Sequence, residues 1–211
     1  MEIPNWLRGS VTKEGLDTVK MAVADAESRT SAEIVPMVVR GSITTGHVPW
    51  LLFFMMVPVT WMLIPLVLHN IVGEILTVVV AAAFAFGLKN FAFIQRWLTP
   101  EKDEEISVMR RAQLEFHLAH LKATEGRTGV LVFVSMLEHK AVVLADQAIA
   151  EKFDPSTWDQ VLEVLLSHTK KKDLVKGMAE AVKLLGTLLA KEFPAPVHNV
   201  NELPNGLIVK D

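Results

Sequence analysis

The chain has 211 residues, of which 51% are hydrophobic and 21% are charged, and its formal net charge is −3. A balance so close to neutral provides no basic field for a nucleic acid, and we expect no nucleic-acid partner. The chain contains no cysteine, which excludes thiol nucleophiles and disulfides.

The first forty residues predict a helix followed by a strand. Apolar residues recur at helical spacing from Thr12 to Ser28, with charged residues on the other faces. Ala32–Val39 is rich in Val and Ile and is bounded by Thr-Ser and Gly-Ser pairs, which is typical of a strand. Pro36 lies within it and has no amide hydrogen, so we expect an edge strand or a bulge.

Two apolar stretches, Val48–Leu68 and Ile71–Leu88, follow back to back. A helix needs about 20 apolar residues to cross the hydrocarbon layer. The pattern predicts a transmembrane hairpin with spans at about residues 48–68 and 71–93, embedded in a lipid bilayer. The alternative is that both stretches are core helices buried inside a soluble protein. A chain of this length has too little other sequence to cover two such helices.

The positions of basic residues predict how the hairpin is oriented. Arg40 precedes the first span, and Lys89, Arg96 and Lys102 follow the second, whereas the connector His69–Glu74 has no Lys or Arg. The positive-inside rule then places both termini and the flanking sequence in the cytoplasm, with the spans in the inner membrane. Residues 1–5 do not resemble the start of a cleavable signal.

A long helix is predicted after the hairpin. Thr99-Pro100-Glu101 is a favourable helix start, and we expect the helix to continue to Lys122 or Ala123. The apolar side chains expected to pack against a sheet are Ile106, Met109, Leu114, Leu118 and Leu121.

The remaining sequence predicts two adjacent strands and then helices. Gly129–Met136 is a continuous apolar run typical of a strand buried on both faces, and Ala141–Leu144 is its neighbour. Ser135 lies within the apolar run, and we expect its hydroxyl to be a buried donor bonded to backbone. The further elements are helices at about Ala145–Lys152, Ser156–His168 and Asp173–Glu192, and an edge strand at Leu207–Val209.

These elements define the expected organisation. The fold class is α/β, a small mixed sheet flanked by helices with a transmembrane helical hairpin inserted into it. Residues 1–42 form the first part of the α/β domain, residues 43–98 the hairpin, residues 99–194 the second part and residues 195–211 a C-terminal tail.

Several segments together resemble the TPM domain family. Thr128–Lys140, continued by Val142–Ile149, resembles the central strand pair and following helix of that family; Thr30–Val35 resembles its first strand, and Trp158-Asp159 its tryptophan-bearing helix. The resemblance implies a compact α/β domain in a family often tied to membranes, including plant thylakoid proteins connected with photosystem repair. Some members are described as acid phosphatases and some bind divalent cations. Unlike the common arrangement, this chain shows no signal peptide, and its hairpin follows the first strand.

Acidic residues near the predicted strand ends suggest a cation site. Asp146 follows a strand, Glu33 begins one, and Asp154 and Asp159 flank the start of the Trp158 helix. Their carboxylate oxygens suit Ca²⁺ or Mg²⁺. The alternative is that Asp146 and Asp154 cap helices and that Glu33 is solvated.

Two functions follow from this pattern. The first is a membrane-anchored, non-catalytic module for binding, assembly or maintenance of a membrane complex, with a membrane protein or a second copy of the chain contacting the hairpin. The second is a membrane-tethered phosphomonoester hydrolase that depends on a divalent cation. No P-loop, Asp-x-Asp pair or cysteine loop supports the second. The basic run Lys170–Lys172 either meets anionic lipid or is a solvated surface.

Overall fold

The computed structural model describes residues 3–43, 48–63, 70–88, 91–119, 128–196, 203 and 205–211. It divides into two compact units. The first, here called the α/β unit, comprises Met1–Ser42 and Val108–Asp211, and the second, here called the hairpin unit, comprises Ile43–Ser107. The tail after residue 194 therefore belongs to the α/β unit.

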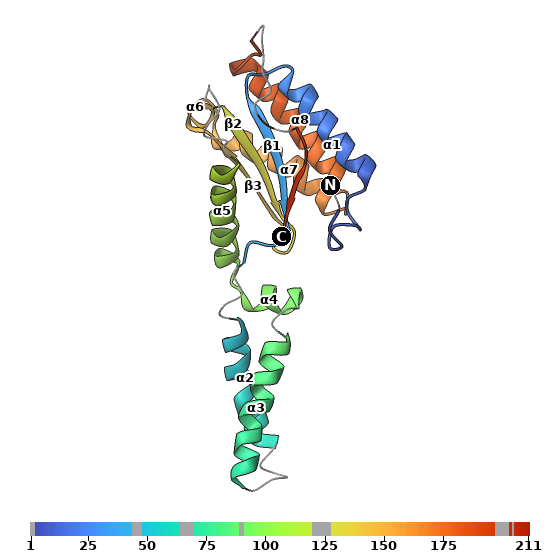
Figure 1. Ribbon diagram of the computed structural model, residues 1–211. Helices are drawn as coiled ribbons and strands as arrows, with labels where there is room; N and C mark the ends of the chain where they lie inside the picture. Colours follow the sequence, from blue (N-terminus) through green and yellow to red (C-terminus); the bar gives the residue numbers. More distant parts are fainter. Residues whose placement is uncertain are drawn as a thin grey trace. The chain divides into compact units, whose positions relative to one another are not determined.

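The α/β unit is built on a four-stranded mixed sheet in the order β3-β2-β1-β4 (Figure 1). Its strands are β1 (Glu33–Val39), β2 (Gly129–Ser135), β3 (Lys140–Ala145) and β4 (Ile208–Lys210). β1 runs parallel to both β2 and β4, whereas β3 is antiparallel to β2. The expected α/β class with a small mixed sheet and flanking helices is confirmed.

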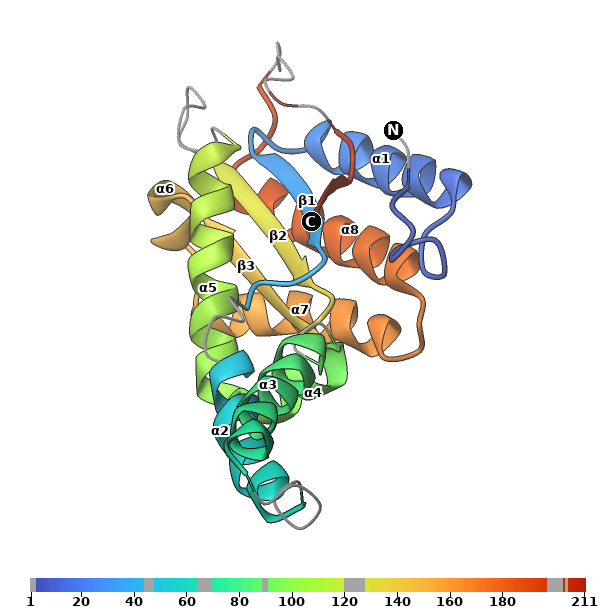
Figure 2. The same ribbon diagram turned by 60° about the horizontal axis from the view of Figure 1, so that its bottom comes forward.

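Helices cover both faces of this sheet (Figure 2). α1 (Lys13–Glu27), α7 (Pro155–Thr169) and α8 (Leu174–Glu192) pack on one face around a core that includes Ile34, Val38 and Val132. α5 (Glu101–Leu118) covers the other face through Val108, Ala112 and Phe116. β1 and β2 are buried along their whole length because each of their faces meets a helical layer.

Glycines allow the helices of the larger layer to approach closely. A Cβ at Gly186 of α8 would lie 2.5 Å from the Ala26 Cβ of α1, and a Cβ at Gly177 would lie 2.8 Å from the Leu165 carbonyl oxygen of α7. Gly15 near the start of α1 meets Val175 near the start of α8 in the same way. The starts of α1 and α8 meet at Gly15 and Val175, and later positions of both helices meet at Ala26 and Gly186. The two helices are therefore parallel.

The expectation that Pro36 marks an edge or a bulge is wrong, because β1 is a central strand in continuous register with β2. The Glu33 amide donates to Thr128, just before β2, on one side of β1, and the Arg40 amide donates to Lys210 of β4 on the other side. Amides alternate between the two sides of a parallel strand, so Pro36 faces β4. β4 pairs only from Met37 onward, and the missing amide of Pro36 therefore breaks no ladder bond.

The predicted apolar stripe of α5 is also wrong. Met109, Leu114 and Leu118 are exposed, and the buried apolar positions are Val108, Ala112 and Phe116, spaced four apart on another face. Both sets have helical spacing, and the sequence places the bulkier residues on the outer face. α5 ends at Leu118 rather than at Lys122 or Ala123, two residues that lie outside the described part of the chain.

The later elements follow the predictions with shifts at their ends. α7 and α8 match the expected helices within one residue at each end, and β4 is an edge strand as predicted. The helix expected at Ala145–Lys152 is a single turn, α6 (Gln147–Ala150), because β3 extends to Ala145 and Asp146 caps the turn.

The hairpin unit contains α2 (Val48–Leu63), α3 (Ile71–Leu88) and α4 (Ala92–Leu98). The predicted first span continues to Leu68, but residues 64–69 lie outside the described residues, as do Lys89 and Asn90. α3 ends at Leu88, so the stretch to residue 93 is not one continuous helix. By length and composition, α3 is a candidate membrane span. The described part of α2 has 16 residues, which is shorter than the 18 residues expected of a span.

Candidate functional site

The structure brings two of the four predicted acidic residues to one end of the sheet. Glu33 begins β1 and is in register with Gly129 at the start of β2. Asp146 follows β3, and its amide donates to the Gly129 carbonyl oxygen at 2.8 Å. Both side chains are at least nine-tenths buried. We call this end of the α/β unit, where β1 and β2 begin, the acidic end.

A third carboxyl group at the acidic end, Glu27, was not among the predicted site residues. Glu27 is the last residue of α1, and its Oε1 accepts a hydrogen bond of 2.8 Å from the Ile34 amide. The Ile34 amide points to the side of β1 on which β4 is too short to reach, so the carboxyl group takes the place of a strand. Burial, with a smaller contribution from the neighbouring Glu33 carboxyl, raises the pKa of Glu27 to about 8, although the Ile34 bond favours the charged form.

We expect the α/β unit to lose stability as pH rises above the ordinary carboxyl range. Folding raises the pKa of Glu27 from 4.5 to about 8. The contribution of Glu27 to the free energy of unfolding is therefore complete below pH 4.5 and is lost as pH rises through 8. At about 1.4 kcal/mol per unit, we expect a loss of roughly 2–4 kcal/mol. Glu27→Gln, which resembles the protonated acid, should abolish this dependence.

The measurement is thermal unfolding together with amide hydrogen exchange at Ile34, at several values between about pH 5 and pH 9. Glu14→Gln on the exposed side of α1 is the matched control and should keep the wild-type dependence. Parallel pH profiles for wild type and Glu27→Gln would contradict the assignment.

The other two predicted acids do not join the acidic end. Asp154 is the N-cap residue of α7 without a side-chain capping bond, and Asp159 is exposed on the same helix. Asp146 caps α6 through a 2.9 Å bond from the Gln147 amide, as its alternative interpretation held. Among the described residues, no three acidic or histidine side chains converge as ligands for a metal ion.

A second cluster of polar side chains lies at the opposite end of the sheet, where β1 and β2 finish. The Ser135 hydroxyl donates to Glu138, and Ser42 Oγ lies 2.8 Å from Ser135 Oγ. The Ser42 amide donates to Glu138 Oε1 at 2.9 Å. Ser135 is thus buried as predicted, but its partners are side chains rather than backbone. These bonds hold the end of β1 against the turn between β2 and β3.

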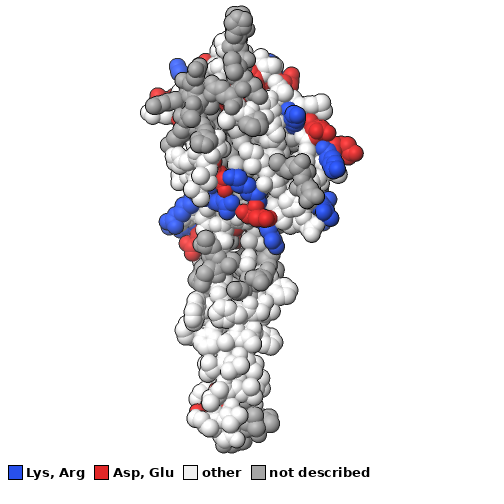
Figure 3. All heavy atoms as spheres, viewed as in Figure 1, with Lys and Arg blue, Asp and Glu red and all other residues white. Residues whose placement is uncertain are grey.

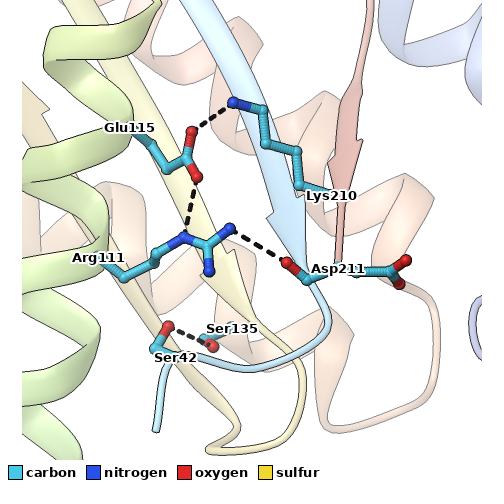
Figure 4. Close-up of polar contacts among 6 residues, drawn as sticks. All are labelled: Ser42, Arg111, Glu115, Ser135, Lys210 and Asp211. Atoms are coloured by element: carbon cyan, nitrogen blue, oxygen red, sulfur yellow. Dashed lines mark hydrogen bonds and ion pairs between the residues drawn. The ribbon is translucent and has the colours of Figure 1, made fainter. Parts of the chain in front are cut away.

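A buried glutamate neutralised by two cations ties α5 to β4 (Figure 4). Glu115 accepts from Arg111 Nε at 2.8 Å and from Lys210 Nζ at 2.5 Å, and its side chain is 3% exposed. Arg111 also donates to the Asp211 carbonyl oxygen at 3.1 Å. Burial acts to raise the pKa of Glu115, but Lys210 and Arg111 outweigh it and hold this pKa below its ordinary value.

The two ends differ in the chemistry that they offer. At the end where β1 and β2 finish, Arg111 and Lys210 are paired with Glu115, and the Ser135 hydroxyl donates to Glu138. These contacts leave this cluster without an activated nucleophile. At the acidic end, Asp146 Oδ2 is buried and accepts no hydrogen bond from the described residues. The clusters therefore support internal positioning more directly than group transfer.

Comparisons with known proteins bear on the fold alone. No protein-family model matches the chain, and no curated protein matches it. Among solved structures, it is similar to the NMR structure of BA42 protein from the psychrophilic bacterium Bizionia argentinensis sp. nov.. The TM-score is 0.62 at 20% sequence identity, over 95% of each chain. An identity this low establishes a shared α/β fold and no activity.

Proposed function

We propose that this protein is a membrane-anchored α/β module that binds or maintains a membrane complex without catalysing a reaction. The hairpin unit is the anchor, inserted in the inner membrane so that the α/β unit and both termini lie in the cytoplasm. The domain is TPM-like in this proposal, on the resemblance of its strands and of its tryptophan-bearing helix. The observation that carries the proposal is the distribution of side chains in α2 and α3.

That distribution is the reverse of the one in a water-soluble helix pair. The buried positions of α3 are small, namely Gly73, Thr77, Ala81 and Ala85, all four residues apart. Only 22% of the α3 segment is buried, and its outer positions are large and apolar. Lipid-exposed helices pack through small residues in this way because lipid tails solvate the large side chains.

The hydroxyl groups of the threonines in the two helices are satisfied by the backbone of their own helix. The Thr77 hydroxyl donates to the Gly73 carbonyl oxygen at 2.9 Å, and the Thr60 hydroxyl donates to Met56 at 2.9 Å. The aromatic rings of Trp50 and Phe86 meet edge to face, with centroids 6.3 Å apart. At about 1.5 Å per residue, the 18 residues of α3 extend roughly 27 Å, close to the thickness of the hydrocarbon layer.

The binding role draws on the α/β unit. Leu114 and Leu118 on α5 are each more than half exposed, and Met109 lies on the outer surface with them. Apolar residues gathered on one exposed helix face are typical of surfaces that partners cover. The cation-dependent hydrolase has the buried Asp146 Oδ2 in its favour, but the described residues contain no group of three acidic or histidine side chains that could hold a metal ion. We therefore do not propose catalysis.

A charge at an exposed position of α3 separates a membrane anchor from a soluble helix pair. Val79 is 56% exposed, so Val79→Lys changes little in a protein surrounded by water. In a bilayer the same substitution costs about 2.5–3.5 kcal/mol near the centre of a span. We expect Val79→Lys to reduce the fraction of protein recovered in alkali-washed membranes by severalfold.

The matched control is Met21→Lys on α1, which is 65% exposed in the α/β unit and should leave membrane recovery unchanged. Reporter fusions at each terminus test the orientation, and both should report cytoplasm. The proposed function would be contradicted if wild-type protein were recovered in the soluble fraction without detergent and Val79→Lys behaved in the same way.

A further inference from the structure

The two ends of the sheet in the α/β unit carry different ionisable side chains. The carboxyl groups of Glu27, Glu33 and Asp146 are buried at the acidic end. Figure 3 shows Lys and Arg gathered in the lower part of the α/β unit, with Asp and Glu among them. We call the end where β1 and β2 finish the basic end, and define it by six exposed residues: Lys13, Arg40, Lys170, Lys171, Lys172 and Lys176.

Contacts between distant segments place these six residues at one end. The segment before α1 reaches the end of β4, because Trp6 Nε1 donates to Asp211 Oδ1 at 2.7 Å. β4 runs parallel to β1, and Arg40 directly follows β1 with its amide bonded to Lys210. The first turns of α1 and α8 lie together through Gly15 and Val175. Lys13, Arg40 and the turn from α7 to α8 therefore share this end.

The charges at the basic end are available to an external anion. Within the described part of the chain, Lys13, Arg40 and the run Lys170–Lys172 form no ion pair, and Lys176 lies 4.0 Å from Glu180. Asp173 is occupied as the cap of α8, accepting from the Lys176 amide at 3.2 Å. Glu14, Asp17 and Asp211 are exposed acids near this end, and together with Asp173 they number four against the six basic residues.

The backbone adds to the same field. α1 and α8, of 15 and 19 residues, are parallel and both begin at the basic end. The amino terminus of a helix carries about half a positive charge, so two adjacent starts reinforce the lysines. The turn that carries Lys170–Lys172 is fixed by backbone bonds from Lys170 to Leu166 and from Asp173 to His168.

The chain leaves the α/β unit from this end and continues to α2. Ser42 follows Arg40 beyond the end of β1, and α2 begins at Val48. Six residues span at most about 20 Å when fully extended. The start of α2 therefore stays within about 20 Å of Ser42, whatever the orientation of the two units.

We propose that the basic end binds the anionic lipid headgroups of the bilayer that holds the hairpin. This inference rests on the proposed function, because the tether supplies the high local concentration of lipid. The lysines come from separate elements rather than from one loop, which suits a field of phosphates better than one bound molecule. Each Lys or Arg near an anionic surface strengthens binding about fivefold, so three neutralised lysines should weaken docking on the order of a hundredfold.

The experiment uses the full-length chain and its lack of cysteine. A single Ser167→Cys beside the lysine run, or Ser28→Cys at the acidic end, is labelled with a fluorescent dye. Both serines are exposed and bond to a carbonyl of their own helix, so the pair is matched. The proteins are reconstituted into phosphatidylcholine vesicles with or without phosphatidylglycerol, and quenching by a nitroxide-headgroup lipid is measured at low and high salt.

We expect strong quenching at position 167 only in vesicles with phosphatidylglycerol, weak quenching at position 28, and loss of the difference at high salt. Lys170→Gln with Lys171→Gln and Lys172→Gln should abolish the difference, while Lys152→Gln with Lys183→Gln and Lys191→Gln should preserve it. Equal quenching at both positions in correctly inserted protein would overturn this inference and leave the anchor intact. Binding of the basic end to an acidic protein instead of lipid would give that same result.

Failure of insertion is a separate outcome that contradicts the proposed anchor. The same unmodified chain is then sedimented with the two kinds of vesicle. Equal recovery with both kinds would overturn the lipid-binding inference as well, whereas phosphatidylglycerol-dependent recovery that the triple Gln variant loses would support it.

Discussion

Replacing Glu115 by Gln should destabilise the α/β unit by about 1–3 kcal/mol, because it leaves Arg111 and Lys210 without their shared buried carboxylate. Both cations are partly exposed and regain some hydration, which keeps the expected cost below that of a fully buried pair. In a unit of this size the thermal midpoint should fall by roughly 3–10 °C. Hydrogen exchange should accelerate first in β4, since Lys210 belongs to that strand.

The pH dependence gives an independent check on Glu115. Its pKa is lower folded than unfolded, so its stabilisation is present above the ordinary carboxyl value and is lost as pH falls through the lowered one. Glu115→Gln should remove this acid sensitivity. Lys210→Met combined with Glu115→Gln should cost less than the sum of the two single changes, because both remove the same ion pair. Glu14→Gln is the control, and additive costs would argue against the pairing.

Elements with one strong local signal were predictable from the sequence. β2 was recognisable because a strand buried on both faces is continuously apolar. α1 and α8 were recognisable because their apolar positions keep one period for 15 residues or more. In these segments the local pattern and the tertiary contacts demand the same residues.

Predictions failed where the conformation or the buried face of an element depends on a segment that is distant in the sequence. Pro36 fits a central strand only because β4, which comes from the far end of the chain, is three residues long. The buried face of α5 is set by the sheet that it covers, and two stripes of equal period competed for that position. Local spacing does not distinguish them.

The candidate site shows the same limit. Glu33 and Asp146 were found because each adjoins a strand, and the register of β1, β2 and β3 brings them to one end. Glu27 was missed because it ends a helix and looks like a solvated residue in an amphipathic pattern. The signal is its position a short turn before β1, a strand that lacks a neighbour at Ile34, and recognising that signal requires the topology.

The close packing of α1 on α8 also links the candidate site to the fold. Ala26, which meets Gly186, directly precedes Glu27, whose carboxyl group holds the Ile34 amide. A shift of α1 away from α8 would therefore move the carboxyl group that completes β1. The basic end depends on the same helix pair, because α1 and α8 start there together.

Gly186→Ala tests this packing and should destabilise the α/β unit by about 2–3 kcal/mol. The added Cβ would lie 2.5 Å from the Ala26 Cβ and 2.9 Å from the backbone α-carbon of the same residue, and no rotamer relieves a clash with backbone. Alanine stabilises a helix by about 1 kcal/mol relative to glycine, so a net loss means that the steric term dominates. The loss should appear as a lower thermal midpoint and as faster amide exchange at Ile34 than at β2.

Ala26→Gly in the same chain should recover part of the loss, because it removes the nearer of the two clashing atoms and leaves the backbone atom in place. Gly9→Ala is the control, since nothing lies within 4 Å of a Cβ at that position, and it should change stability by less than about 0.5 kcal/mol. A stabilising Gly186→Ala would mean that α1 and α8 lie farther apart than described.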